Sequence, residues 1–153
     1  KEIYSTDAQA SGLLVMAFAL GLRHSLPRRR LSTAGVALLT LFGAAIAASS
    51  SKTDWSTVRD GDPSTVNGIV HGAAFMIAIP SVLAATVVIG LALRGAASWR
   101  PFAIASPLVG VALVVSLVLG PHGQATFLVF LAILFGWILA LALRQRGLEA
   151  RTH

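Results

Sequence analysis

Five long apolar stretches, separated by short polar turns, leave this chain few ways to fold. They cover residues 8–22, 31–48, 67–93, 102–120 and 124–143. A helix rises about 1.5 Å per residue and the hydrocarbon layer of a membrane is about 30 Å thick, so roughly 20 residues cross it. The third stretch is long enough to tilt, and polar residues before the first can extend it outward. We therefore predict an all-α, polytopic transmembrane helix bundle of about five spans.

The composition is typical of a protein that is surrounded by lipid. Of the 153 residues, 56% are hydrophobic and 12% are charged, whereas a soluble domain carries about 25% charged residues. The only sizeable polar loop is 49–66, so we expect residues 1–153 to form a single transmembrane helical domain. The chain has no cysteine, which excludes disulfides, thiolate metal sites and cysteine nucleophiles.

The basic residues are distributed unevenly between the two ends of the predicted spans. Nine arginines lie in the turns after the first and third stretches and after the fifth, whereas Lys1, Lys52 and Arg59 lie at the opposite ends. The positive-inside rule then places the N-terminus outside and the C-terminus inside, in a bacterial cytoplasmic (inner) membrane. The net charge of +6 belongs to these turns and not to a polar domain. We therefore expect membrane lipids as partners and no nucleic acid; the run Arg28–Arg30 attracts anionic lipid as any cytoplasmic loop of this type would.

The beginning of the chain suggests that an earlier segment precedes it. Lys1-Glu2-Ile3-Tyr4 is not an initiating sequence, and no signal-peptide apolar region comes before it. An N-terminus outside the cell would then need a leading helix. We expect six spans in the native protein, with both ends in the cytoplasm.

Tryptophans and small residues indicate how the spans are arranged. Trp55 and Trp99 follow span ends, where an indole can lie at the level of the lipid headgroups, whereas Trp137 is deeper and is expected to pack between helices. Small residues recur at four-residue spacing, which lets helix backbones approach closely in lipid. They are Ala8 with Ser11 and Gly12, Gly43 with Ala47, and Gly68 with Gly72.

His71 is the ionisable residue that lies clearly inside an apolar stretch, about one turn into the third. Such residues are functional candidates by default. In one interpretation, a neutral imidazole hydrogen-bonds a neighbouring helix near the outer interface, through Asp54, Ser49 or Gln124. In the other, His71 binds haem or a pigment, and only His122 is available on the same side as a second ligand. The sequence requires no cofactor.

The polar residues around the outer ends of the spans form a speculative ligand-binding set: Asp54, Asn67, His71, His122 and Gln124. Pro80 and Pro107 interrupt apolar stretches and would supply the broken helices that transport pockets favour; we expect Pro80 to kink its helix. We predict no catalytic residue, because no nucleophile elbow is present. We also predict no metal site, because the acidic residues of the outer loop lack the spacing of a calcium loop.

Three segments resemble the uncharacterised bacterial membrane family known as domain of unknown function 998 (DUF998). They are the small-residue helix Gly12–Arg23 with its basic end, Thr53-Asp54, which is similar to a Pro-Thr-Asp element, and Asn67-Gly-Ile-Val-His71, which is similar to a His-x-x-x-His element. Asn67 replaces the first histidine of that element, which weakens a paired-ligand role. The resemblance extends from about Ala8 to Arg146 and implies an additional leading span, but no activity.

Three functions are compatible with these features. We favour a non-enzymatic structural or accessory subunit of a larger membrane complex, because polar groups are few and small residues suited to helix contacts recur. Other membrane protein subunits would then be its partners. The first alternative is a bundle that binds or transports a small molecule or lipid through a polar pocket near the outer leaflet. The second is a haem- or pigment-binding membrane protein that uses His71.

Overall fold

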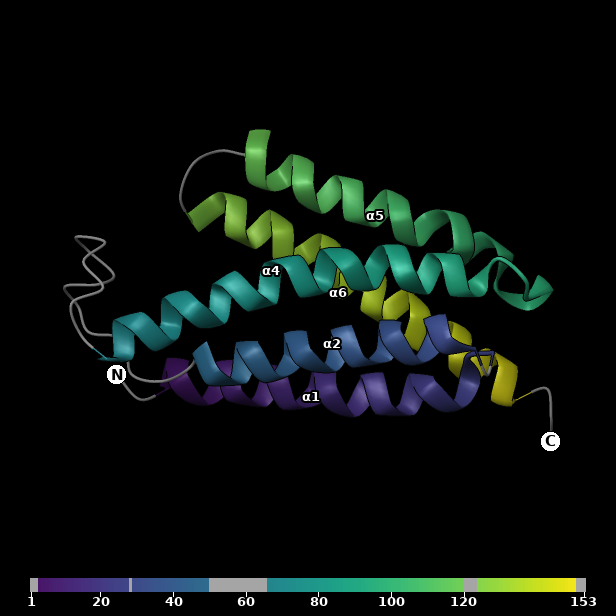
Figure 1. Ribbon diagram of the computed structural model, residues 1–153, viewed down its shortest axis with the longest axis horizontal. Helices are drawn as coiled ribbons and strands as arrows, with labels where there is room; N and C mark the ends of the chain where they lie inside the picture. The colour runs from purple at the N-terminus through teal and green to yellow at the C-terminus, as the bar shows by residue number, and fades with distance from the viewer. Residues whose placement is uncertain (1–2, 28, 50–65, 120–123, 151–153) are drawn as a thin grey trace. The chain divides into compact units, whose positions relative to one another are not determined.

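The computed structural model describes residues 3–27, 29–49, 66–119 and 124–150, and Figure 1 shows that they form helices joined by turns. No strand occurs in this part of the chain. The elements are α1 (Ile3–Ser25), α2 (Arg30–Ser49), α4 (Val66–Leu93), the short 3-10 helix η1 (Ala97–Trp99), α5 (Arg100–Leu119) and α6 (Gln124–Glu149). The all-α prediction with five long helices is therefore confirmed.

The helices extend beyond the apolar stretches that predicted them. α1 begins at Ile3 and α6 ends at Glu149, so both include polar turns that the sequence pattern left outside. The reason is that apolar residues report which part of a helix avoids water, whereas backbone hydrogen bonds continue into polar turns. α4 and α5 run as helices through Pro80 and Pro107. The bend at Pro80 stays a prediction.

Four segments are long and apolar enough to cross a membrane: Arg30–Ser49, Gly68–Leu93, Ala97–Leu119 and Ala125–Leu148. By helix length and hydropathy the chain is therefore a multi-pass membrane protein. We predicted a fifth span in α1, but within the described residues α1 lacks the length of high mean hydropathy that the other four segments have. The first turns of α1 carry Ser5, Thr6, Asp7 and Gln9, and these shorten its apolar length.

The helices group into two compact units. Unit 1 consists of Lys1–Leu20 and Ala37–Val82, and unit 2 of Gly21–Val36 and Leu83–His153. The prediction that residues 1–153 form one domain stays a prediction.

In unit 1, the backbones of α1 and α2 come very close at two glycines. A Cβ added to Gly12 would lie 2.5 Å from the Gly43 carbonyl oxygen and 2.6 Å from the Ala47 nitrogen. A Cβ on Gly43 would lie 2.7 Å from the Gly12 carbonyl oxygen. Real Cβ atoms do not approach backbone atoms so closely, so only glycine fits at these positions. The spacing of small residues in the sequence predicted this kind of contact.

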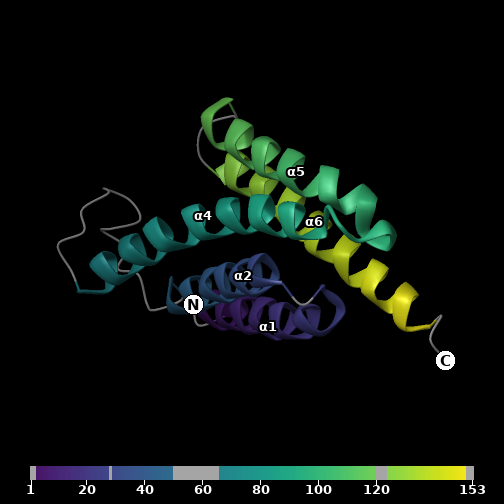
Figure 2. The same ribbon diagram turned by 45° about the vertical axis from the view of Figure 1, so that its right-hand side comes forward.

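In unit 2, α5 and α6 lie side by side, as Figure 1 and Figure 2 both show. The buried indole of Trp137 on α6 donates a hydrogen bond from Nε1 to the Ser106 hydroxyl on α5, at 3.0 Å. This confirms the prediction that Trp137 packs between helices. α4 joins α5 through Gly90, because a Cβ there would lie 2.5 Å from Cδ of Pro107. Gly90 therefore makes room for the proline ring.

Trp99 is the last residue of η1, directly before α5, and its placement at headgroup level stays a prediction. Its side chain is only 2% exposed. The ring packs edge-on against Phe102, with the two ring centroids 5.7 Å apart. The indole therefore stabilises the turn from η1 into α5 by packing within the protein.

Candidate functional site

The predicted ligand-binding set is only partly within the described residues. Asp54 and His122 lie outside them. Asn67 and Gln124 lie in the first turns of α4 and α6, and their side chains are outside the description. His71 is the member whose side chain can be placed. The set as a whole therefore stays a prediction.

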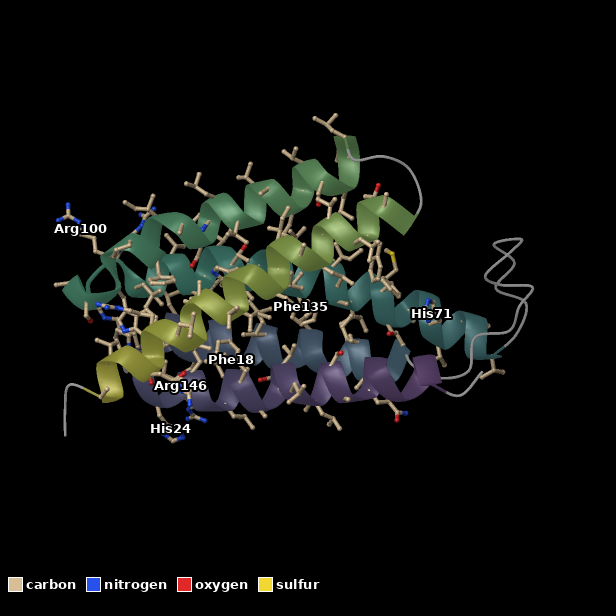
Figure 3. All side chains as sticks on the ribbon, turned by 180° about the vertical axis from the view of Figure 1, so that it is seen from behind. Phe18, His24, His71, Arg100, Phe135 and Arg146 are labelled. Atoms are coloured by element: carbon tan, nitrogen blue, oxygen red, sulfur yellow. The ribbon has the colours of Figure 1, made fainter. Side chains whose placement is uncertain are left out.

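His71 lies in the second turn of α4 (Figure 3). Its half-buried ring reaches the end of α2. Its Nδ1 is 2.8 Å from the main-chain oxygen of Ser49. Because a carbonyl oxygen can only accept, Nδ1 must carry the proton and donate it. Of the three partners that the sequence left open, Asp54, Ser49 and Gln124, the structure shows a hydrogen bond to Ser49. The acceptor is the main chain, however, since the Ser49 hydroxyl donates to the Ile46 carbonyl oxygen at 2.8 Å.

This hydrogen bond has a structural reason at the end of α2. Ser49 is the last residue of α2, and the final carbonyl groups of a helix have no N–H partner within it. Where water does not satisfy such a carbonyl, a donor from another element does. His71 supplies that donor and so caps α2 from α4.

Phe75 covers one face of the same imidazole. It follows His71 by one helical turn, and the two ring centroids are 4.9 Å apart with their planes tilted by 49°. Residues four positions apart lie on one face of a helix, which brings these rings together. The hydrogen bond to Ser49 and the aromatic contact with Phe75 both help to fix the ring of His71.

The cap predicts how substitutions at His71 act. His71→Gln and His71→Asn should retain the fold, because a side-chain amide can also donate to a carbonyl. His71→Leu should lower the free energy of unfolding by about 1 kcal/mol, the size of a typical interhelical hydrogen bond in a bilayer. Unfolding in mixed detergent, followed by circular dichroism, measures the difference.

Ser49→Ala is the matched control, since it leaves the accepting carbonyl in place and should change stability little. Equal losses in His71→Gln and His71→Leu would show that ring packing, and not hydrogen bonding, fixes this contact. A haem-binding role requires more than the cap. An absorbance spectrum of the purified protein tests it directly.

The three basic turns that the sequence placed on one side of the membrane come together at one end of unit 2. Arg144 of α6 donates from Nε to the Ser98 carbonyl oxygen in η1, at 3.0 Å. Gln145 donates to the Gly21 carbonyl oxygen in α1, at 3.4 Å. These two hydrogen bonds hold the end of α6 close to η1 and to the last turns of α1. Figure 3 shows His24, Arg100 and Arg146 at this end.

Arg29 and Gly95 add a further contact at this basic end. A Cβ on Gly95 would lie 2.6 Å from Nη2 of Arg29, so the guanidinium lies directly over the glycine after α4. The predicted clustering of positive charge is therefore a feature of the fold of unit 2. Sequence reasoning missed the cavity that opens beside these arginines, although Ser32-Thr33, one residue after the arginine run, is typical of the beginning of a helix.

Comparison with known proteins identifies a family over almost the whole chain. Residues 1–146 match the family described as "Protein of unknown function (DUF998)". The resemblance based on Gly12–Arg23, Thr53-Asp54 and the segment ending at His71 is thereby confirmed. No curated protein and no solved structure matches the chain.

Proposed function

Because this chain belongs to the DUF998 family, whose description states no activity, we propose a function from its own surface. We propose that it is a non-enzymatic accessory subunit of a larger membrane complex. The contact with its partner is made by the middle of α6. The observation that carries this proposal is the environment of Gly136.

Gly136 differs from the glycines that hold this fold together. A Cβ added at Gly12, Gly43, Gly90 or Gly110 would meet another element of its own unit at 2.5–2.7 Å. A Cβ added at Gly136 would meet no described atom within 4 Å. A glycine within a helix costs about 1 kcal/mol relative to alanine. In a membrane span, a close contact with a second helix can offset this loss of helix stability.

The neighbours of Gly136 extend this surface along α6. Ala132 and Ala140 lie one turn before and one turn after it, and both are at least partly exposed. Small residues at four-residue spacing let a second helix approach closely. This stripe is therefore suited to a span of another protein.

Several polar side chains inside the described part of the chain stabilise the helices or their contacts. Thr86 and Ser116 donate to carbonyl oxygens three residues earlier in their own helices, each at 2.8 Å. Trp137 is paired with Ser106, and His71 caps α2. These roles support a protein that acts by assembly. The pocket near the outer leaflet and the haem site stay predictions.

We test the subunit proposal by purifying the tagged protein from native membranes in mild detergent. The wild type should copurify with other membrane subunits, identified by mass spectrometry. Gly136→Leu should lose them while remaining folded, because the added side chain blocks a close helix approach. Ala105→Leu is the matched control: it adds similar volume to an exposed position on α5 and should retain the partners. A wild-type protein that emerges alone and monodisperse contradicts the proposal.

We also propose an orientation in a bacterial cytoplasmic membrane. The N-terminus lies outside and the C-terminus inside, and α1 crosses the membrane in addition to the other four spans. The gathering of the basic turns at one end of unit 2 supports it. In intact cells, Ser56→Cys should react with an impermeant thiol reagent and Ser98→Cys should not. Reversed labelling would overturn the orientation.

A further inference from the structure

A cavity of about 530 Å³ opens at the basic end of unit 2, where the chain turns from α1 into α2. Its lining includes Arg23, His24, Arg29, Arg30, Ser32 and Thr33. All of these belong to one unit and to the described residues. Three observations on this lining indicate what the cavity binds.

The first observation is an unpaired hydroxyl. Ser32 is only 5% exposed, yet its Oγ has no hydrogen-bond partner within the described part of the chain. Buried polar atoms are nearly always paired, and an unpaired one needs an explanation. Because Ser32 lines the cavity, a ligand in the cavity can supply the missing partner.

The second observation is the beginning of α2. The amide of Thr33 already bonds to the Arg29 carbonyl oxygen, at 3.2 Å. The N–H groups of Arg30, Leu31 and Ser32 precede it and, by helix geometry, have no acceptor inside α2. A helix N-terminus also carries a partial positive charge. These donors and the Ser32 hydroxyl therefore favour an anion.

The third observation is a large excess of positive charge. Arg23, Arg29 and Arg30 are exposed at the cavity. Unit 2 contains one acidic residue, Glu149 at the end of α6, against nine arginines. The contact with Gly95 holds the Arg29 guanidinium at this end of the unit. The arginines are therefore available to an external anion.

We propose that this cavity binds a phosphate group. A phosphate offers several oxygens in a tetrahedral arrangement, which can accept from Ser32 Oγ, the first amides of α2 and the arginine guanidiniums together. Guanidinium groups match phosphate oxygens in pairs. The phosphate comes either from the headgroup of an anionic lipid or from a soluble phosphate compound. The site is independent of the contact proposed for α6.

Calorimetric titration of the full chain in an uncharged detergent tests this proposal. The probes are inorganic phosphate and a short-chain phosphatidylglycerol, both at constant ionic strength, with a short-chain diacylglycerol as the phosphate-free comparison. Ser32→Ala and Arg30→Gln should each weaken phosphate-group binding about tenfold, since each removes one charge-assisted hydrogen bond. Ser98→Ala and Arg100→Gln are the matched controls. They make the same changes at exposed positions outside the cavity lining and should stay within about twofold of the wild type.

Stability without ligand separates a binding role of Ser32 from a structural one. Ser32→Ala should melt at the same temperature as the wild type or higher, because it removes an unpaired buried hydroxyl. Binding of both probes means that the site recognises phosphate itself, and binding of phosphatidylglycerol alone means that it recognises a lipid headgroup. Binding of neither, or equal losses in all four variants, overturns the proposal.

Discussion

Gly12→Ala should lower the free energy of unfolding by about 3 kcal/mol, at the upper end of what overpacking a close contact costs. The added Cβ would lie 2.5 Å from one backbone atom of α2 and 2.6 Å from another. Backbone atoms of a helix cannot rotate away as the end of a side chain can, so α1 has to move off α2. Unfolding in mixed detergent, followed by circular dichroism, measures the loss.

The control for this substitution is Gly136→Ala, which makes the same chemical change where a Cβ meets no described atom within 4 Å. Alanine favours a helix over glycine by about 1 kcal/mol, so this variant should be as stable as the wild type or more stable. If Gly12→Ala is as well tolerated as Gly136→Ala, the close crossing of α1 and α2 is not what holds unit 1 together.

Trp137→Ala should lower the free energy of unfolding by about 3–5 kcal/mol, the usual range for deleting a large buried aromatic side chain. The substitution leaves a cavity between α5 and α6 and removes the partner of the Ser106 hydroxyl. Both Trp137 and Ser106 are buried, at 4% and 0% exposure. Water therefore has little access to replace the lost hydrogen bond.

A series of variants separates the packing of Trp137 from its hydrogen bond. Trp137→Phe keeps most of the aromatic volume and loses the Nε1 donor, so a loss of about 1–2 kcal/mol is expected. A double-mutant cycle with Ser106→Ala should give a coupling energy of similar size. Phe135→Ala is the control, since that ring is 42% exposed on the same helix. A loss as large in Phe135→Ala as in Trp137→Ala would show that α6 is generally intolerant of truncation.

The positions of the helices follow from the sequence because burial in lipid requires long apolar stretches. Their ends do not follow, as α1 and α6 show, since polar residues continue a helix once it has begun. The difficulty of predicting helix ends also explains the difference in the number of spans. The apolar part of α1 predicted a fifth span, but the polar turns that belong to the same helix reduce its mean hydropathy.

Contacts between helices were predictable only as candidates. Four-residue spacing of small residues indicated Gly43 and Gly72 equally, yet only Gly43 has a close neighbour among the described atoms. Spacing along one helix cannot show which face the next helix covers. For the same reason the unpaired hydroxyl of Ser32 has no signature in sequence, because it depends on what the fold leaves uncovered.

The partner of His71 could be narrowed to a few groups because so few polar residues lie near it. The sequence favoured the side chains of Asp54, Ser49 and Gln124. That the acceptor is the main-chain oxygen of Ser49 depends on where α2 ends, and the last residue of a helix is the least predictable part of it.

Because His71 bonds to Ser49, the packing of α2 against α4 in unit 1 does not depend on the length of the segment that joins them. The ends of that connection are held together by a contact outside it, so the helices do not need the connection to set their spacing. Lengthening a flexible loop adds little entropy loss, about 0.6 kcal/mol for each doubling of its length. An epitope inserted between α2 and α4 should therefore leave the helices of unit 1 unaltered.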